Sequence, residues 1–142
     1  MTSSWRPTIN VTNWSSRKLH GKGAKWSIMA QPRAWQIGDG GVYQLTPNAN
    51  SLVDVMQGAM TMDRYRDDFM RRARRLGDLK PGELVGTRNG VGIVATVESG
   101  DSILCGCSKA KAKRNECHRV WAAYVLFEAG WRVILDGAEV AI

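Results

Sequence analysis

The stretch SILCGCSKAKAKRNECHRVWAAYVLFEAGWRVIL, residues 102–135, decides the fold that we predict for this chain. Its first six residues form an apolar run typical of a buried strand, and residues 131–135 form another. Between these runs, the segment from Glu116 to Ala129 is apolar on most sides, which predicts a largely buried helix that Gly130 ends. A strand, a crossover helix and a second strand make a parallel βαβ unit. In such units, ligands bind where the strand ends face the helix N-termini.

The rest of the chain predicts both strands and helices, without repeats or long linkers, and therefore a single α/β domain over residues 1–142. The further strands that we expect are residues 8–12, 25–30 and 91–97. A short helix is expected over residues 52–56. The clearest helix spans residues 61–76, where apolar side chains recur every three or four positions and Thr61 is placed to cap the N-terminus.

The composition limits the class of protein. Twenty Lys and Arg against 13 Asp and Glu leave a net charge of +7, which favours a phosphate-bearing partner such as DNA, RNA or a nucleotide. No apolar run reaches the roughly 18 residues that a membrane span needs, and the N-terminus has no recognisable secretory signal. Three clustered cysteines are an odd number for a disulfide framework and fit a reducing compartment. We therefore expect a cytoplasmic protein without a membrane partner.

The predicted helix start brings together a thiol, an imidazole and a guanidinium. With Asn115 as N-cap, Cys117, His118 and Arg119 would lie in the first turn, where unpaired backbone N–H groups favour negative charge. This setting lowers the pKa of a thiol, His118 could act as acid or base, and Arg119 could bind a phosphate through paired donors. A structural interpretation is also open, in which Arg119 pairs with a carboxylate and His118 bonds to neighbouring backbone.

Polar and cationic side chains near this helix start predict an anion-binding rim. The rim comprises Ser16, Arg17 and His20 of the first loop, with Lys111, Lys113 and Arg114 of the loop before the helix. A lysine-rich loop is solvated by default, so its position beside the helix start is what suggests an anionic ligand. A second basic surface is expected on the helix over residues 61–76, from Arg64, Arg71, Arg72 and Arg75.

Cys105, Cys107, Cys117 and His118 could together supply the four ligands of a zinc site. The first two are two residues apart on a strand and share one face, which favours this interpretation. The last two are adjacent on a helix and point about 100° apart, and a C-x-C pair on a straight strand lacks the ligand spacing of usual zinc sites. We therefore expect no cofactor and keep zinc as the minority hypothesis.

Four short stretches of this chain occur in an order that matches a known family. They are the Cys-His-Arg sequence at 117–119 after an apolar strand that ends in cysteine, the strand and loop at 9–17, Leu45-Thr46-Pro47, and Asp63-Arg64-Tyr65-Arg66. In this order, and over most of the chain, they resemble the domain-of-unknown-function family 488.

The resemblance implies a Rossmann-like three-layer sandwich with a mostly parallel central sheet, and it implies little about activity. The matched site residues, carried over by position, are Cys117, His118, Arg119, the strand-end Cys105 and Tyr65 of the basic helix. This chain departs from the family at Cys107, which weakens a zinc site that uses this cysteine. Its glycine-rich segment 82–100 is also less helical than the family pattern.

We therefore expect a protein that acts on nucleic acid or a nucleotide, and our first hypothesis is that it is an enzyme. In that hypothesis Cys117 is the reactive or anion-contacting thiol, His118 carries a proton and Arg119 holds a phosphate, with Cys105 and Tyr65 in support. The first alternative is a noncatalytic DNA- or RNA-binding module, whose cations bind the nucleic-acid backbone. The second is a phage-type protein-interaction or inhibitor factor.

Overall fold

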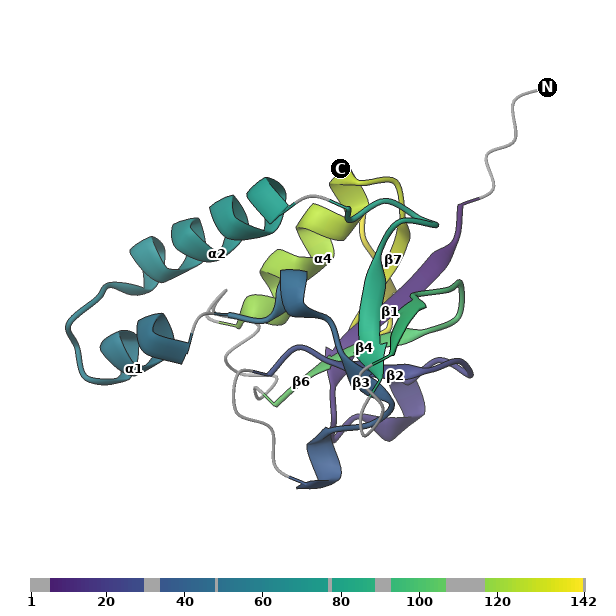
Figure 1. The fold of residues 1–142 in the computed structure, drawn as a ribbon, viewed down its shortest axis with the longest axis horizontal. Helices are drawn as coiled ribbons and strands as arrows, with labels where there is room; N and C mark the ends of the chain where they lie inside the picture. The colour runs from purple at the N-terminus through teal and green to yellow at the C-terminus, as the bar shows by residue number, and fades with distance from the viewer. Residues whose placement is uncertain are drawn as a thin grey trace.

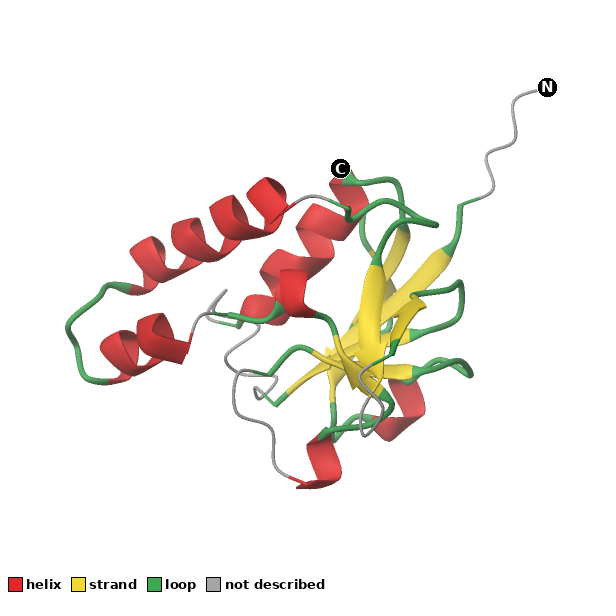
Figure 2. Ribbon diagram, viewed as in Figure 1, coloured by secondary structure: helices red, strands yellow, loops and turns green. Residues whose placement is uncertain are grey.

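The computed structural model describes residues 6–29, 34–47, 49–76, 78–88, 93–106 and 117–141. Its strands are β1 (Thr8–Asn13), β2 (Lys25–Ser27), β3 (Gly40–Gly41), β4 (Val85–Arg88), β5 (Val94–Thr96), β6 (Ser102–Cys105), β7 (Arg132–Leu135) and β8 (Ala138–Glu139). Its helices are α1 (Ala49–Met56), α2 (Met62–Leu76), α4 (His118–Glu128) and the short 3-10 helices η1 (Arg17–Leu19), η2 (Ala34–Gln36) and η3 (Tyr43–Leu45). Strands and helices are interspersed along the chain and pack together, which confirms the predicted α/β class (Figures 1 and 2).

The described strands form one mixed sheet of eight strands in the order β5-β4-β3-β2-β6-β1-β7-β8. From β3 to β7 in this order, neighbouring strands pair in parallel, whereas β4, β5 and β8 add antiparallel pairs at the two edges. Asn13 at the end of β1 aligns with Cys105 at the end of β6, and Val11 aligns with Leu135 at the end of β7. The carboxyl ends of these three strands therefore meet at one edge, where open α/β sheets bind ligands.

The predicted βαβ unit is present, because α4 connects β6 to β7 and packs against both strands and against β1, which lies between them. α2 packs on α4, and α1 packs on α2. Figures 1 and 2 show these three α-helices on the same side of the sheet. Because the described α-helices share one side and the sheet edges are antiparallel, the Rossmann-like three-layer sandwich with a mostly parallel sheet stays a prediction.

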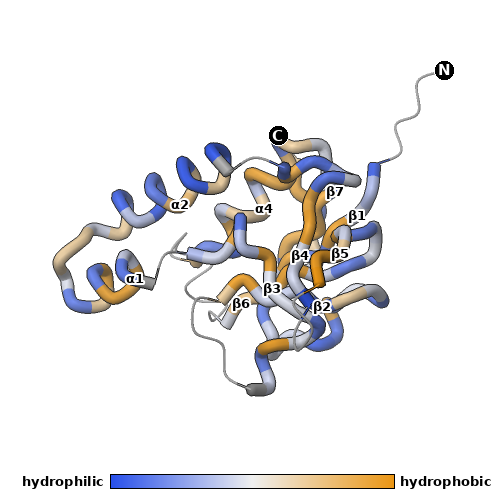
Figure 3. Tube along the Cα trace, viewed as in Figure 1, coloured by the Kyte–Doolittle hydropathy of each residue, from blue (hydrophilic) through white to orange (hydrophobic). Residues whose placement is uncertain are grey.

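The core lies between the sheet and α4 and is built largely from aromatic side chains. Trp26, Trp121 and Trp131 are each at most 1% exposed. The rings of Tyr65 and Phe69 on α2 contact the ring of Trp121, with centroids 5.5 and 5.7 Å apart. Figure 3 shows hydrophobic residues along the sheet and α4, and hydrophilic residues along one side of α2. α2 therefore covers α4 with an apolar stripe and leaves its charged side chains to solvent.

The helix predicted over residues 61–76 is confirmed, including its cap. The hydroxyl of Thr61 accepts a hydrogen bond from the backbone N–H of Arg64 at 3.2 Å, as an N-cap side chain does. The predicted short helix at 52–56 is also present and begins earlier, as α1. Within the described ranges, no helix combines the length and the apolar character that crossing a membrane requires.

Element boundaries differ from the predicted ones at the helix that carries the Cys-His-Arg sequence. α4 begins at His118 with Cys117 as its N-cap, so Cys117 precedes the first turn instead of lying in it. The predicted cap Asn115 and the predicted first residue Glu116 lie outside the described residues. The strand predicted over residues 131–135 is also not the last one, because β7 continues through a turn into β8.

Candidate functional site

Cys117 and Cys105 place their sulfur atoms together at the carboxyl edge of the sheet. Cys105 ends β6, and Cys117 caps α4. Their Sγ atoms are 3.3 Å apart, the two cysteines are not disulfide-bonded, and neither has any exposed area. The Sγ of Cys117 also accepts the backbone N–H of Arg119 at 3.5 Å, so a side chain other than the predicted asparagine satisfies this helix end.

Arg119 holds both sulfurs and a carboxylate at once, although its side chain is fully buried. Its Nε and Nη2 donate to the carboxylate of Asp136, with the shortest contact of each at 3.2 Å. Its Nη1 donates to the Sγ atoms of Cys105 and Cys117 at 3.3 and 3.6 Å. Burial alone would lower the pKa of Arg119, but both cysteines and Asp136 outweigh it and raise the pKa above its ordinary value. Arg119 therefore stays charged.

Asp136 was not singled out by the sequence, and it fixes the orientation of Arg119. It lies in the turn between β7 and β8, and the hydroxyl of Thr12 donates to its Oδ1 at 2.8 Å. The sequence could have pointed to Asp136, because this carboxylate directly follows the predicted strand 131–135. Residues at such positions lie at the edge where open α/β sheets bind ligands. The pairing of Asp136 with Arg119 is the carboxylate contact that the structural interpretation expected.

His118 is buried, and its ring is held by backbone and by an aromatic side chain. Its Nε2 lies 2.8 Å from the carbonyl oxygen of Ile28, and its ring centroid lies 5.9 Å from that of Phe69. Desolvation by burial lowers the pKa of His118 and outweighs the opposing effects of Cys105 and the Ile28 carbonyl, and Arg119 adds the smallest effect, which also lowers this pKa. The imidazole is therefore neutral near pH 7, and its Nε2–H donates to the Ile28 carbonyl.

The predicted rim residues of the first loop lie elsewhere on the same edge of the sheet. The backbone N–H of Ser16 donates to Oδ1 of Asn13 at 2.9 Å, and Nε2 of His20 lies 3.0 Å from the carbonyl oxygen of Asn13. Arg17 is exposed and lines an open hollow of about 500 Å³ together with Ser16. Because Asn13 aligns with Cys105, this loop leaves the sheet beside the cysteine pair, but Ser16 and His20 bond to Asn13 at the end of their own strand. The anion-binding role of these residues stays a prediction.

Four other predicted site residues lie outside the described residues: Cys107, Lys111, Lys113 and Arg114. Among the residues that the structure does describe, no group of three or more His, Cys, Asp or Glu is placed to hold a metal ion. Of the four ligands of the minority zinc hypothesis, the described three are Cys105, Cys117 and His118, and Nε2 of this histidine faces a backbone carbonyl.

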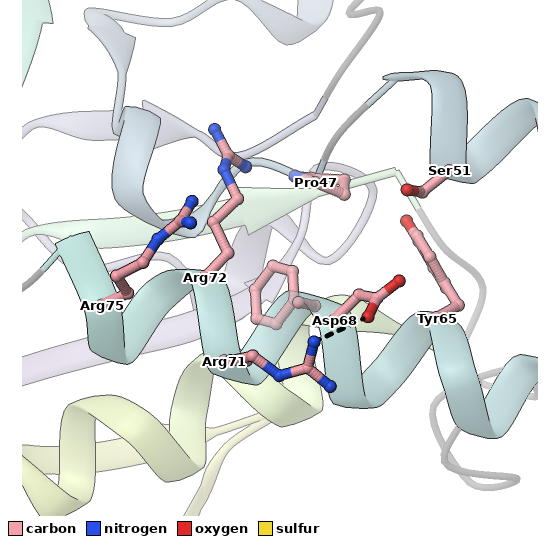
Figure 4. A pocket seen from close by; sticks show the side chains of 8 residues that line it. Pro47, Ser51, Tyr65, Asp68, Arg71, Arg72 and Arg75 are labelled. Carbon is pink, nitrogen blue, oxygen red and sulfur yellow. Dashed lines mark ion pairs between the residues drawn. The ribbon is translucent and has the colours of Figure 1, made fainter.

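A pocket between α2, α1 and η3 gathers a different set of polar side chains, and the sequence predicted only its basic character. We call it the arginine pocket. It has a volume of about 210 Å³ and is lined by Pro47, Ser51, Tyr65, Asp68, Phe69, Arg71, Arg72 and Arg75. Figure 4 shows the hydroxyl groups of Ser51 and Tyr65 pointing toward one another at one end, with Arg72 and Arg75 extending from the same side of α2. Phe69 separates the pocket from His118.

The three arginines of the arginine pocket differ in how they are held. Arg71 pairs with Asp68 at 3.5 Å (Figure 4). Arg72 lies over the ring of Tyr43, 4.5 Å from its centroid, and donates from Nη1 to the carbonyl of Thr46. The guanidinium of Arg75 is exposed and makes no ion pair or hydrogen bond with the described part of the chain. With three arginines against one aspartate, the lining carries net positive charge.

Comparison with known proteins assigns no family or role to this site. No family model matches the chain, and neither a curated protein nor a solved structure is similar to it. The resemblance to family 488 therefore stays a prediction that rests on the residues quoted for it. The interpretation of the site rests on its geometry alone.

Proposed function

We propose that this protein binds the phosphate groups of a nucleic acid or a nucleotide, and that the arginine pocket is where it does so. The observation that carries the proposal is that Arg72 and Arg75 line one pocket together with Ser51 and Tyr65, which bear hydroxyl groups. Guanidinium groups bind phosphate through paired N–H donors, and hydroxyl groups add neutral donors. The net charge of +7 favours the approach of such a ligand.

The proposal fits a phosphate group with part of its nucleotide better than a whole drug-sized molecule. Pockets for such molecules occupy roughly 300–1,000 Å³, whereas the arginine pocket has about 210 Å³. Arg75 is the cation most available to a ligand, because Asp68 engages Arg71 and the carbonyl of Thr46 engages Arg72. Arg72 is held in place by the same contact, which lowers the entropy cost of using it.

An enzyme that uses Cys117, His118 and Arg119 is the second candidate. One observation favours it: Nη1 of Arg119 donates to the sulfurs of Cys117 and Cys105, and a nearby guanidinium stabilises a thiolate. Against a direct role on a phosphate ester, the sulfur is fully buried and Asp136 occupies the other donors of Arg119. Binding is therefore the function that the geometry supports first, and catalysis on nucleic acid or a nucleotide comes second.

Two further expectations belong to the same proposal. A Rossmann-like arrangement is supported by the five neighbouring parallel strands from β3 to β7, and by the position of Cys117 at a strand-to-helix junction. Membership of family 488 is supported by the proximity of its matched residues, since Cys105, Cys117 and Arg119 are in direct contact.

Fluorescence anisotropy of a labelled single-stranded oligonucleotide, with ATP as competitor, tests the proposed binding. We expect binding at low salt, displacement by ATP, and an affinity that falls linearly on a log–log scale as salt rises. A binding module also predicts that Cys117→Ser leaves the affinity unchanged, whereas catalysis at Cys117 predicts turnover that this variant loses. An absence of binding at low salt, or binding that salt does not change, would reject the proposal in favour of a protein-interaction or inhibitor factor.

A further inference from the structure

The paired sulfurs of Cys105 and Cys117 form a site that phosphate binding does not use. They come from different elements, the end of β6 and the N-cap of α4, and lie 3.3 Å apart without a disulfide bond. Neither cysteine lines the arginine pocket. Two thiols in direct contact are the arrangement that a dithiol needs before it can close to a disulfide.

The surroundings of this pair place hydrogen-bond donors on both sulfurs, and the thiolate is the nucleophilic form of cysteine. Arg119 has Nε and Nη2 committed to Asp136, so its Nη1 is the part that faces the sulfurs, at 3.3 Å from Cys105 and 3.6 Å from Cys117. Cys117 also accepts a backbone N–H at the start of α4, where the helix dipole favours negative charge. His118 is close by but neutral and bonded to the Ile28 carbonyl, so it does not compete for the sulfurs.

We propose that Cys105 and Cys117 are a redox-active dithiol that reduces low-molecular-weight disulfides and closes to an intramolecular disulfide. The thiolate of Cys117, which receives the additional backbone N–H, attacks one sulfur of the small disulfide. The S–S bond of that molecule breaks, one half leaves as a thiolate, and the other half forms a mixed disulfide with Cys117. Cys105 then attacks the sulfur of Cys117 and releases the second half as a thiol. Two electrons and two protons pass from the pair to the small disulfide.

The required movement is small and can be accommodated at the start of the helix. The sulfurs must approach from 3.3 Å to about 2 Å. Cys117 has extended backbone geometry before the first helical residue, so a change there affects the hydrogen bond from Val120 N–H to the Cys117 carbonyl and leaves those further along α4 in place. Because both sulfurs are buried, the small disulfide can reach them only when the helix start opens, and we expect oxidation over minutes to hours.

Incubation of the full chain with glutathione disulfide tests this proposal directly. Samples are quenched in acid, unfolded, alkylated with N-ethylmaleimide, and analysed by intact mass and peptide mapping. The chain has three cysteines, so we expect one alkylated thiol and a single link between Cys105 and Cys117. The intact mass should be two hydrogens below that of the reduced chain with one N-ethylmaleimide group. Adding excess dithiothreitol should restore all three alkylation sites.

Two variants separate this pair from the third cysteine. Cys107→Ser should still form the disulfide, whereas Cys105→Ser should stop at the mixed disulfide on Cys117. Three alkylated thiols after equilibration with glutathione disulfide would overturn the proposal, and so would a disulfide that maps to Cys107. The wild-type measurement decides the matter even if Cys105→Ser does not fold.

Discussion

Arg119 and Asp136 form a bidentate ion pair in which the arginine has no exposed side-chain area and the aspartate is 25% exposed. The pair joins the first turn of α4 to the turn after β7, and Thr12 extends it to β1. It therefore ties together three of the strand and helix ends that meet at the carboxyl edge of the sheet. This relationship also explains why Arg119 is oriented toward the sulfurs and not toward solvent.

We predict that Asp136→Asn destabilises the protein, because it removes the charge that compensates a buried guanidinium. Breaking a buried pair costs roughly 3–5 kcal/mol, and the partial exposure of Asp136 reduces the expected loss to about 2 kcal/mol. The free energy of unfolding from urea denaturation measures it. Glu139→Gln is the matched control, since it removes a carboxylate from the exposed Arg132 pair of the same hairpin and should cost less than about 1 kcal/mol. Equal losses in the two variants would contradict the role given to Asp136.

We predict that the stability falls as the pH drops below about 6.5, because burial lowers the pKa of His118 in the folded state. The unfolded chain then binds more protons than the folded chain, so acid favours unfolding between the unfolded pKa and the lower folded pKa. One such proton gives a slope of at most about 1.4 kcal/mol per pH unit. Urea denaturation between pH 5 and 8 measures the slope.

Two glutamine variants assign this pH dependence. His118→Gln should flatten the slope in this window, while His20→Gln, at the other histidine of the chain, should leave it in place. An unchanged slope in His118→Gln would show that other groups cause the pH dependence.

We predict that Gly86→Ala is destabilising, because a Cβ at this position would overlap the ring of the fully buried Trp26. Overpacking of this kind costs roughly 1–3 kcal/mol. Gly41→Ala is the control: it lies on the neighbouring strand β3, and its added Cβ would have its nearest contact at 3.5 Å, an ordinary distance. Thermal unfolding followed by circular dichroism compares the two. The close packing of Gly86 on Trp26 would be refuted if both variants melted at the same temperature.

The elements with strong local signals could be predicted from the sequence. α2 has its apolar stripe and the Thr61 cap, and the unit β6-α4-β7 has two apolar runs around an apolar helix. β3 could not be predicted in this way, because two glycines carry no strand preference and pair with β2 and β4 only once the chain has folded. β8 is equally short and depends on the turn at Asp136.

The main residues of the candidate site could be predicted from the sequence, but most of their contacts could not. The sequence brings Cys117, His118 and Arg119 together by position, and the apolar run of residues 102–107 indicates the strand that carries Cys105. The partners of these side chains come from distant parts of the chain, such as Ile28 for His118 and Asp136 for Arg119. The arginine pocket depends on the packing of α1 and η3 against α2, which no local pattern encodes.

We predict that the salt dependence of oligonucleotide binding identifies the contacts that the arginine pocket makes. Loss of one phosphate contact reduces the slope of log affinity against log salt by about 1. Arg72→Ala should therefore lower both the affinity and the slope, although the loss of its contact with the Thr46 carbonyl and the Tyr43 ring adds a local cost. The same anisotropy titration at several salt concentrations measures this. A lower affinity with an unchanged slope would show that Arg72 supports the pocket without contacting phosphate.

The most direct test of the proposed function compares Arg75→Ala with Arg64→Ala in that titration at low salt. Both residues are exposed arginines on α2, but only Arg75 lines the arginine pocket. We predict that Arg75→Ala weakens binding of the oligonucleotide about tenfold or more, since a charge-assisted hydrogen bond contributes about 1.5–3 kcal/mol. Arg64→Ala should change the affinity less than about twofold. Equal effects of the two substitutions, or no effect of Arg75→Ala, would contradict phosphate binding in the arginine pocket.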